Sequence, residues 1–239
     1  MTTNKRRILK IEEPLKCLIL ERVNRFVVKV LLDDKPTRAY VNNTGRLHDY
    51  LNEGRTGFCI RPRRPGKTDC RLFGVSEDGL AAIVDTQLQM EAFEKALEMG
   101  LFPWMKGYRL LKRNERLGGS LIDYLLDCRG ETVYLEVKSA VMKEGEVAMY
   151  PDCPSARGRK HIRELTEHVK GGGHGSVLFI AALPGVKAFR PNQSADPELS
   201  RMLTEALKVG VELRSIGLYF DPEDSFVYLF DPDLEVYMS

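Results

Sequence analysis

No run of about 18 apolar residues occurs in this chain, so the sequence predicts no transmembrane helix and no membrane partner. The basic start, residues 1–10, also lacks the long apolar core and the small-residue cleavage site of a signal peptide. The five cysteines are odd in number and include no CxxC pair or Cys/His cluster, which argues against a zinc site or a disulfide framework. We therefore expect a cytoplasmic protein with reduced thiols packed in or near its core.

Positive charge is absent from residues 221–239, which contain six Asp or Glu residues. These acids could serve protein interaction, or they could protect an exposed sheet edge from pairing. The net charge of the whole chain is +2, so the remainder is basic. Its basic residues gather in three segments, 55–71, 106–116 and 157–163. Each segment alone could be a solvated face, but three together favour a polyanionic partner, for which nucleic acid is the expected choice. The residues expected to contact it are Arg61, Arg63, Arg64 and Lys67 in the first segment and Arg157, Arg159, Lys160 and His161 in the third.

Residues 1–84 consist mainly of short strand patterns, which predict a small β-barrel domain of the oligonucleotide-binding (OB) type. A short helix is expected at 46–52, closed by Gly54. Most aromatic side chains of such a barrel belong to its core, while one or two can face a ligand and stack on bases. The strands are expected at 15–32, 38–41, 58–61, 70–75 and 80–84, and the aromatic candidates are Phe26, Tyr40, Phe58 and Phe73.

Residues 85–239 change to alternating helix and strand patterns, which predict a second domain of the α/β sandwich class. The fold class is therefore a two-domain chain, a barrel followed by an α/β domain. The loop 171–175 is rich in glycine but precedes a strand, so a helix-to-strand connector is favoured over a phosphate-binding loop. Helices are expected at 86–99, 156–169 and 197–209, a buried parallel strand at 177–183, and late strands at 211–218 and 226–230.

A β-hairpin is predicted at 121–138, where two apolar runs flank the two-residue turn Arg129-Gly130. If Cys128 pairs with Glu131, the register places Asp123 directly opposite Glu136. Two carboxylates opposite each other on one sheet face repel. A surface hairpin with solvated charges would explain an isolated pair of this kind.

A bound divalent cation would remove the repulsion between Asp123 and Glu136. Side chains alternate along a strand, so Lys138 lies on the same face as Glu136. This arrangement is typical of a metal-dependent phosphodiesterase. Glutamates elsewhere could add a metal contact or could be surface residues, and His161 could act as a catalytic base. The additional glutamates are Glu91, Glu94, Glu98 and Glu115.

Four segments, taken together and in this order, resemble the sugar fermentation stimulation protein A family. The resemblance implies an OB-like domain at 1–84 and a restriction-endonuclease-like domain of the PD-(D/E)xK type at 85–239. It also implies DNA binding and a regulatory role in sugar metabolism. The segments are Val41-Asn42-Asn43-Thr44-Gly45-Arg46-Leu47, Gly119-Ser120-Leu121-Ile122-Asp123-Tyr124, Leu135-Glu136-Val137-Lys138-Ser139, and residues 150–165 with Arg157-Gly158-Arg159-Lys160-His161.

By motif match, Asp123, Glu136 and Lys138 occupy the nuclease positions. The resemblance favours a Mg²⁺- or Mn²⁺-dependent nuclease in which Asp123 and Glu136 bind the metal, with the backbone carbonyl of Val137 as a third ligand. The chain departs from the family at Leu121, where the family commonly has Arg, and at Tyr124, where it has Phe. The alternative function is a non-catalytic DNA-binding protein in which the hairpin is a relic or a structural metal site.

Overall fold

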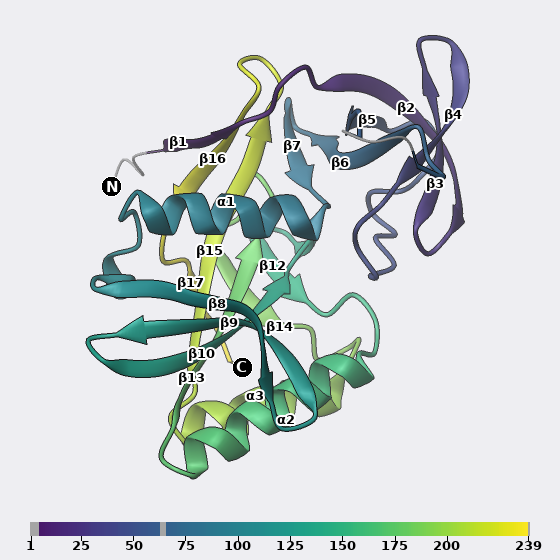
Figure 1. The fold of residues 1–239 in the computed structure, drawn as a ribbon. Coiled ribbons are helices and arrows are strands. Elements are labelled where there is room, and N and C mark those ends of the chain that lie inside the picture. The colour runs from purple at the N-terminus through teal and green to yellow at the C-terminus, as the bar shows by residue number, and fades with distance from the viewer. Residues whose placement is uncertain (1–4, 63–65, 239) are drawn as a thin grey trace.

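The N-terminal part of the chain is a closed five-stranded barrel, as the sequence predicts. A computed structural model describes residues 5–62 and 66–238 (Figure 1). The barrel closes because the last residues of its third strand pair in parallel with the start of its fifth, through Ala39 and Cys70. Cys17, Cys59 and Cys70 are buried inside it, as expected for thiols packed in a core. The barrel strands are β2 (Leu15–Asn24), β3 (Val27–Leu32), β4 (Lys35–Tyr40), β5 (Thr56–Ile60) and β6 (Cys70–Glu77).

The helix predicted at 46–52 is wrong, because these residues form turns instead. Leu47 has a φ of 51°, which interrupts a right-handed helix. The carbonyls of Gly45 and Arg46 accept hydrogen bonds from the Arg22 guanidinium rather than from amides one turn later. Contacts distant in sequence therefore override the local capping signal.

The second domain is built on a mixed sheet that continues from the barrel. Strand β7 (Leu80–Ile83) leaves the barrel and pairs with β15 through Ala81 and Phe220. The Phe220 ring also contacts Phe73, with ring centroids 4.9 Å apart, so an aromatic cluster fills the junction. The sheet order is β7-β15-β13-β10-β9-β8, with β16 paired to β15 and β1 paired to β16. These strands are β1 (Arg6–Lys10), β8 (Tyr108–Leu117), β9 (Ser120–Cys128), β10 (Glu131–Ser139), β13 (His174–Ala181), β15 (Glu212–Asp221) and β16 (Phe226–Asp231).

Strands β9 and β10 form the predicted hairpin in the predicted register. Arg129 and Gly130 have φ values of 57° and 94°, the positive values that a tight two-residue hairpin turn requires. Cys128 pairs with Glu131, and the pairing continues along the two strands to residues 124 and 135. The buried strand β13 runs parallel to β10 and to β15, which confirms the parallel arrangement expected for its continuous apolar run.

Three helices cover the sheet, within two residues of their predicted bounds: α1 (Thr86–Glu98), α2 (Ala156–Lys170) and α3 (Pro197–Lys208). In Figure 1, α1 lies above the sheet and α2 and α3 pack together below it. Asp85, Ser155 and Asp196 cap their N-termini by accepting amide hydrogen bonds. A 3₁₀ turn, Pro103–Met105, follows α1. In the described part of the chain, each helix is too short or too polar to cross a membrane.

A small second sheet supports the loop that leads into α2. Its strands, in spatial order, are β11 (Met142–Glu144), β12 (Val147–Tyr150), β14 (Ala188–Pro191) and β17 (Glu235–Val236). The Phe189 ring of β14 stacks on Phe179 of β13 with centroids 3.9 Å apart, so this sheet packs directly on the main one. These short strands were not predicted from the sequence.

Candidate active site

A cleft of about 780 Å³ lies between the barrel and the second domain. Asp123, Glu136, Val137 and Lys138 line one part of it. The barrel contributes the β2–β3 turn and the loop 42–45 to the same cleft. The structure therefore brings the residues predicted from the hairpin to one place and adds a wall from the other domain.

Asp123 lies where β9 and β10 separate. Backbone pairing between the two strands ends at Tyr124 and Leu135. Just beyond, the Asp123 carboxylate accepts a hydrogen bond of 2.8 Å from the amide of Val137. The side chain thus satisfies an amide that would otherwise lose its partner where the strands part.

Glu136 is the centre of a buried polar group. Its Oε1 atom accepts hydrogen bonds from Lys138 Nζ at 2.5 Å and from His161 Nδ1 at 2.6 Å. Arg157 Nε donates to His161 Nε2 at 3.3 Å. Because Nε2 accepts this bond, the imidazole ring carries its proton on Nδ1, which faces Glu136. Glu136 is 2% exposed and Lys138 is 8% exposed, so both charges are held inside the protein. Paired charges of this kind lose much of their hydration, and the contacts between them offset that loss.

The two carboxylates differ in proton affinity. Burial, and then the nearby charge of Glu136, raise the pKa of Asp123 to about 6. Burial also opposes ionisation of Glu136, but Lys138 and His161 outweigh it and lower the pKa of Glu136. Burial disfavours the Lys138 cation, yet the adjacent Glu136 carboxylate raises the Lys138 pKa above its usual range. Lys138 is therefore charged at neutral pH in this geometry.

The donor set fits a hard divalent cation that keeps several water ligands. The Glu136 Oε2 atom is buried and has no hydrogen-bond partner in the structure. An unpartnered carboxylate oxygen in the interior is costly, and a cation would satisfy it. In the described ranges, no three His, Cys, Asp or Glu side chains are placed to hold a metal together. Two carboxylates, with the Val137 carbonyl and water, match the sparse oxygen ligation of Mg²⁺ or Mn²⁺.

A loop of the barrel is fastened to the second domain beside the cleft. Asp152 of the second domain accepts a hydrogen bond of 2.8 Å from the Leu47 amide, and Asn43 donates one of 2.9 Å to the carbonyl of Val84, the last residue of the barrel domain. Gly45 packs so closely that an added Cβ would lie 2.7 Å from a carboxylate oxygen of Asp152. These contacts explain why an Asn-Thr-Gly segment occurs here, and they hold the barrel against the cleft.

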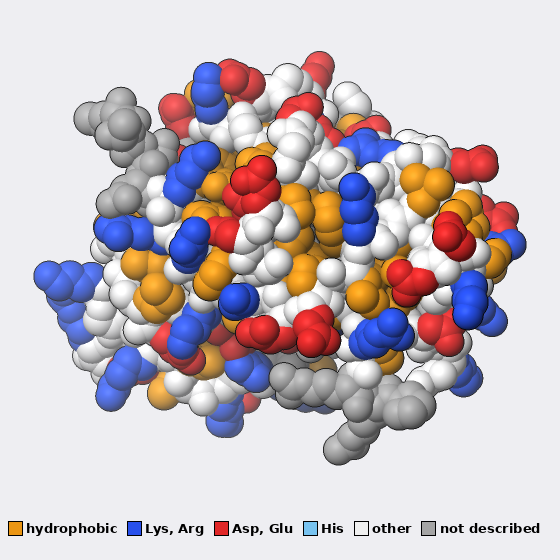
Figure 2. Space-filling model, turned by 90° about the horizontal axis from the view of Figure 1, so that it is seen from above, with side chains coloured by type: hydrophobic (Ala, Val, Ile, Leu, Met, Phe, Trp, Pro, Cys, Tyr) orange, Lys and Arg blue, Asp and Glu red, His pale blue; other side chains and the backbone are white. Residues whose placement is uncertain are grey.

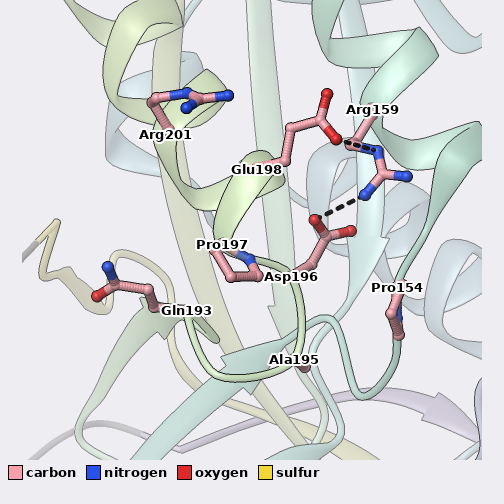
Figure 3. A pocket seen from close by; sticks show the side chains of 8 residues that line it. All are labelled: Pro154, Arg159, Gln193, Ala195, Asp196, Pro197, Glu198 and Arg201. Carbon is pink, nitrogen blue, oxygen red and sulfur yellow. Dashed lines mark hydrogen bonds and ion pairs between the residues drawn. The ribbon is translucent and has the colours of Figure 1, made fainter.

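The predicted nucleic-acid contacts on α2 have different surroundings. Arg157 is exposed and lines the cleft. Arg159 lies instead in a separate pocket, where it pairs with Asp196 at 2.9 Å and with Glu198 at 3.3 Å (Figure 3). Lys160 donates to the carbonyl of Gly119 at 2.7 Å and so holds the β8–β9 turn against the helix.

The described residues of the other two basic segments lie outside the cleft lining. Arg61 and Lys67 are exposed on the loop between β5 and β6, whereas Arg63 and Arg64 lie outside the described residues. In the second segment, three of the cations pair with acids. Basic and acidic side chains are interspersed on the face shown in Figure 2. The paired residues are Arg109 with Asp127, Lys112 with Glu115, and Arg113 with Glu94.

None of the four additional glutamates considered from the sequence lines the cleft. Glu94, for example, accepts a hydrogen bond of 2.8 Å from the hydroxyl of Tyr124. Helix α1 instead presents Gln89, which donates to Ser139 Oγ of β10 at 2.9 Å. Gln89 could have been identified from the sequence, because it is a polar residue within the otherwise apolar face of the predicted helix.

A barrel of the OB type joined to a restriction-endonuclease-like domain is the architecture that these features define. Two family models match the chain, the SfsA N-terminal OB domain over residues 20–84 and the sugar fermentation stimulation protein RE domain over residues 87–224. The chain belongs to the sugar fermentation stimulation protein family.

Two relatives and one solved structure match this chain along almost their whole length. A sugar fermentation stimulation protein homolog from Pyrococcus furiosus is 42% identical over 230 residues, which cover 96% of this chain and 100% of the relative. One from Archaeoglobus fulgidus is 46% identical over 230 residues, covering 96% and 99%. The solved structure of Pyrococcus furiosus SfsA in complex with Ca²⁺ matches with a TM-score of 0.94 and 41% identity, covering 97% of this chain and 99% of that one.

Proposed function

We propose that this protein is a Mg²⁺- or Mn²⁺-dependent nuclease that hydrolyses phosphodiester bonds in nucleic acid, with DNA as the expected substrate. The observation that carries the proposal is the buried, unpartnered Glu136 Oε2 atom beside Asp123 in the cleft between the two domains. The Ca²⁺ complex of the Pyrococcus furiosus relative supports binding of a divalent cation.

Asp123, Glu136 and the Val137 carbonyl would hold the ion. When bound, the ion supplies positive charge to phosphate oxygens and lowers the pKa of water. Lys138, held in place by Glu136, would present a second positive charge to the phosphate that is being cleaved. His161 also donates to the Oε1 atom of Glu136, which helps to fix the carboxylate and leaves the Oε2 atom available.

Two further groups would hold the nucleic-acid backbone. The exposed Arg157 guanidinium lies at the cleft, beside the N-terminal turn of α2. Amides at a helix N-terminus favour phosphate, and a nearby arginine adds charge. Arg61 and Lys67 would contact nucleic-acid strands that extend beyond the cleft. The ion pairs of Arg159 favour a structural role for that residue.

A cleavage assay with matched variants tests the proposal. Asp123→Ala and Lys138→Ala should each lower Mn²⁺-dependent cleavage of mixed DNA substrates by at least about a hundredfold. Asp127→Ala is the control, because Asp127 lies on the same strand but pairs with Arg109 outside the cleft. Cleavage by all three variants at the wild-type rate would refute the nuclease site. Metal-independent DNA binding without cleavage by the wild type would favour the non-catalytic alternative.

A further inference from the structure

The β2–β3 turn of the barrel presents an aromatic ring to the candidate active site. Phe26 is 43% exposed, although large aromatic side chains are usually buried. It lines the same cleft as Asp123, Glu136 and Lys138. The other candidate aromatics of the barrel differ, since Phe58 and Phe73 are buried in the core. The exposed ring therefore lies on the side of the barrel that faces the catalytic carboxylates.

The ring is supported from behind and its backbone is fixed. Tyr40 stacks on Phe26 with centroids 6.4 Å apart and an angle of 25° between the rings. The Phe26 amide donates to Asn24 Oδ1 at 2.9 Å, and its carbonyl accepts from Val41 at 2.9 Å. Arg22 donates to the carbonyls of residues 24 and 25 and also to those of the loop at residues 45 and 46. A rigid platform of this kind costs little entropy when a ligand binds to it.

Arg25 places a positive charge next to the Phe26 ring. Its guanidinium lies 5.7 Å from the centroid of the Phe26 ring, and it has no ion-pair partner among the described residues. A cation–π contact at an exposed site is weaker than the stacking of a nucleobase on an aromatic ring. A base can therefore replace the guanidinium over the ring, and the freed guanidinium can then pair with a phosphate.

We propose that Phe26 and Arg25 form a site for one unpaired nucleotide of the strand whose phosphate lies at Asp123 and Glu136. The inference rests on the proposed function and extends it to the substrate class. A base inside a duplex is stacked on its neighbours and cannot offer its face to Phe26, so the site selects single-stranded or extruded nucleotides. The cleft volume of about 780 Å³ lies within the range of about 300–1,000 Å³ for small-ligand pockets, so the cleft has room for one nucleotide.

The test is a binding measurement in EDTA, which separates recognition from cleavage. Fluorescein-labelled single strands of about 20 nucleotides, one of thymidine and one of uridine, are compared with a duplex of equal length by fluorescence anisotropy at about 50 mM salt. The wild type should bind the single strands at least about tenfold more tightly than the duplex. Phe26→Ala should weaken single-strand binding by roughly 5- to 100-fold and duplex binding by less than about twofold. The relative affinities of the two single strands distinguish DNA from RNA as the source of the nucleotide.

Two further variants keep the test decisive. Phe26→Trp should retain wild-type affinity, and its indole fluorescence should be quenched by the stacked base. Tyr237→Ala is the control, because Tyr237 is 42% exposed but does not line the cleft. The site would be overturned if Phe26→Ala bound single strands as tightly as the wild type, or if it lost the same affinity for single strands and for the duplex. Either result would leave the nuclease proposal intact. Failure of the wild type to bind any of the three substrates would overturn nucleic-acid recognition itself.

Discussion

Asp123→Asn should stabilise the metal-free protein at neutral pH. The structure raises the pKa of the Asp123 carboxyl from 3.8 to about 6, through burial and then the charge of Glu136. Because one pKa unit corresponds to about 1.4 kcal/mol, the ionised carboxylate costs the folded state about 3 kcal/mol at pH 8. Asparagine is neutral at every pH and keeps an oxygen that can accept the Val137 amide.

The predicted gain depends on pH with a definite sign. A carboxyl whose pKa is higher in the folded state destabilises the protein as pH rises from the unfolded pKa to the folded one. The advantage of Asp123→Asn should therefore be about 3 kcal/mol at pH 8, about 1.5 kcal/mol at pH 5 and under about 1 kcal/mol at pH 4. For a chain of this size, about 3 kcal/mol corresponds to roughly 6–12 °C in Tm.

Calorimetric or denaturant unfolding in EDTA at pH 8, 5 and 4 measures this difference. Asp127→Asn is the matched control on the same strand, and it should have the opposite sign. A hydrogen bond from Arg109 lowers the Asp127 pKa, so the charged carboxylate stabilises the folded state. Replacing it by a neutral amide should therefore destabilise the protein at neutral pH. An Asp123→Asn variant no more stable than wild type at pH 8, or equally stabilised at pH 4, would refute the electrostatic reasoning.

Four further substitutions probe residues in and around the site. Gly45→Ala should lower the free energy of unfolding by about 1–3 kcal/mol, measured by urea denaturation, because its Cβ would meet the Asp152 carboxylate; unchanged stability would contradict the packing. Leu121→Arg should change stability by less than about 0.5 kcal/mol, since Leu121 is 47% exposed, and should tighten DNA binding in anisotropy titrations with a steeper dependence on salt. Arg159→Ala should lower stability by about 2 kcal/mol, because it leaves the buried Asp196 carboxylate without its charged partner, whereas Arg157→Ala should mainly weaken DNA binding, and the reverse pattern would exchange their roles.

The hairpin could be predicted in detail because its determinants are local. The turn at Arg129-Gly130 fixes the register, and the two-residue alternation of strands then determines which side chains share a face. The three helices were predictable for the same reason, since capping residues and helical periodicity lie within each segment. Lys138 and Glu136 contact each other as this reasoning requires.

The remainder depends on contacts between distant parts of the chain. No local pattern shows that His161 approaches Glu136, that Arg159 pairs with Asp196, or that Phe26 faces the cleft across a domain boundary. The failed helix at 46–52 has the same origin, because Arg22 takes the carbonyls on which that helix depends. Short strands such as β11 and β17 carry too few residues for a period to be recognised.

Calorimetric titration of Mn²⁺ into the wild type and into the Asp123→Ala/Glu136→Ala double variant tests the central claim most directly. We predict saturable binding by the wild type at a single site and its loss in the double variant, because these carboxylates are the only charged metal ligands in the proposed site. The same samples, assayed for cleavage of DNA and RNA, should show activity in the wild type alone. A wild type that binds no Mn²⁺, or a double variant that binds it equally well, would contradict the account.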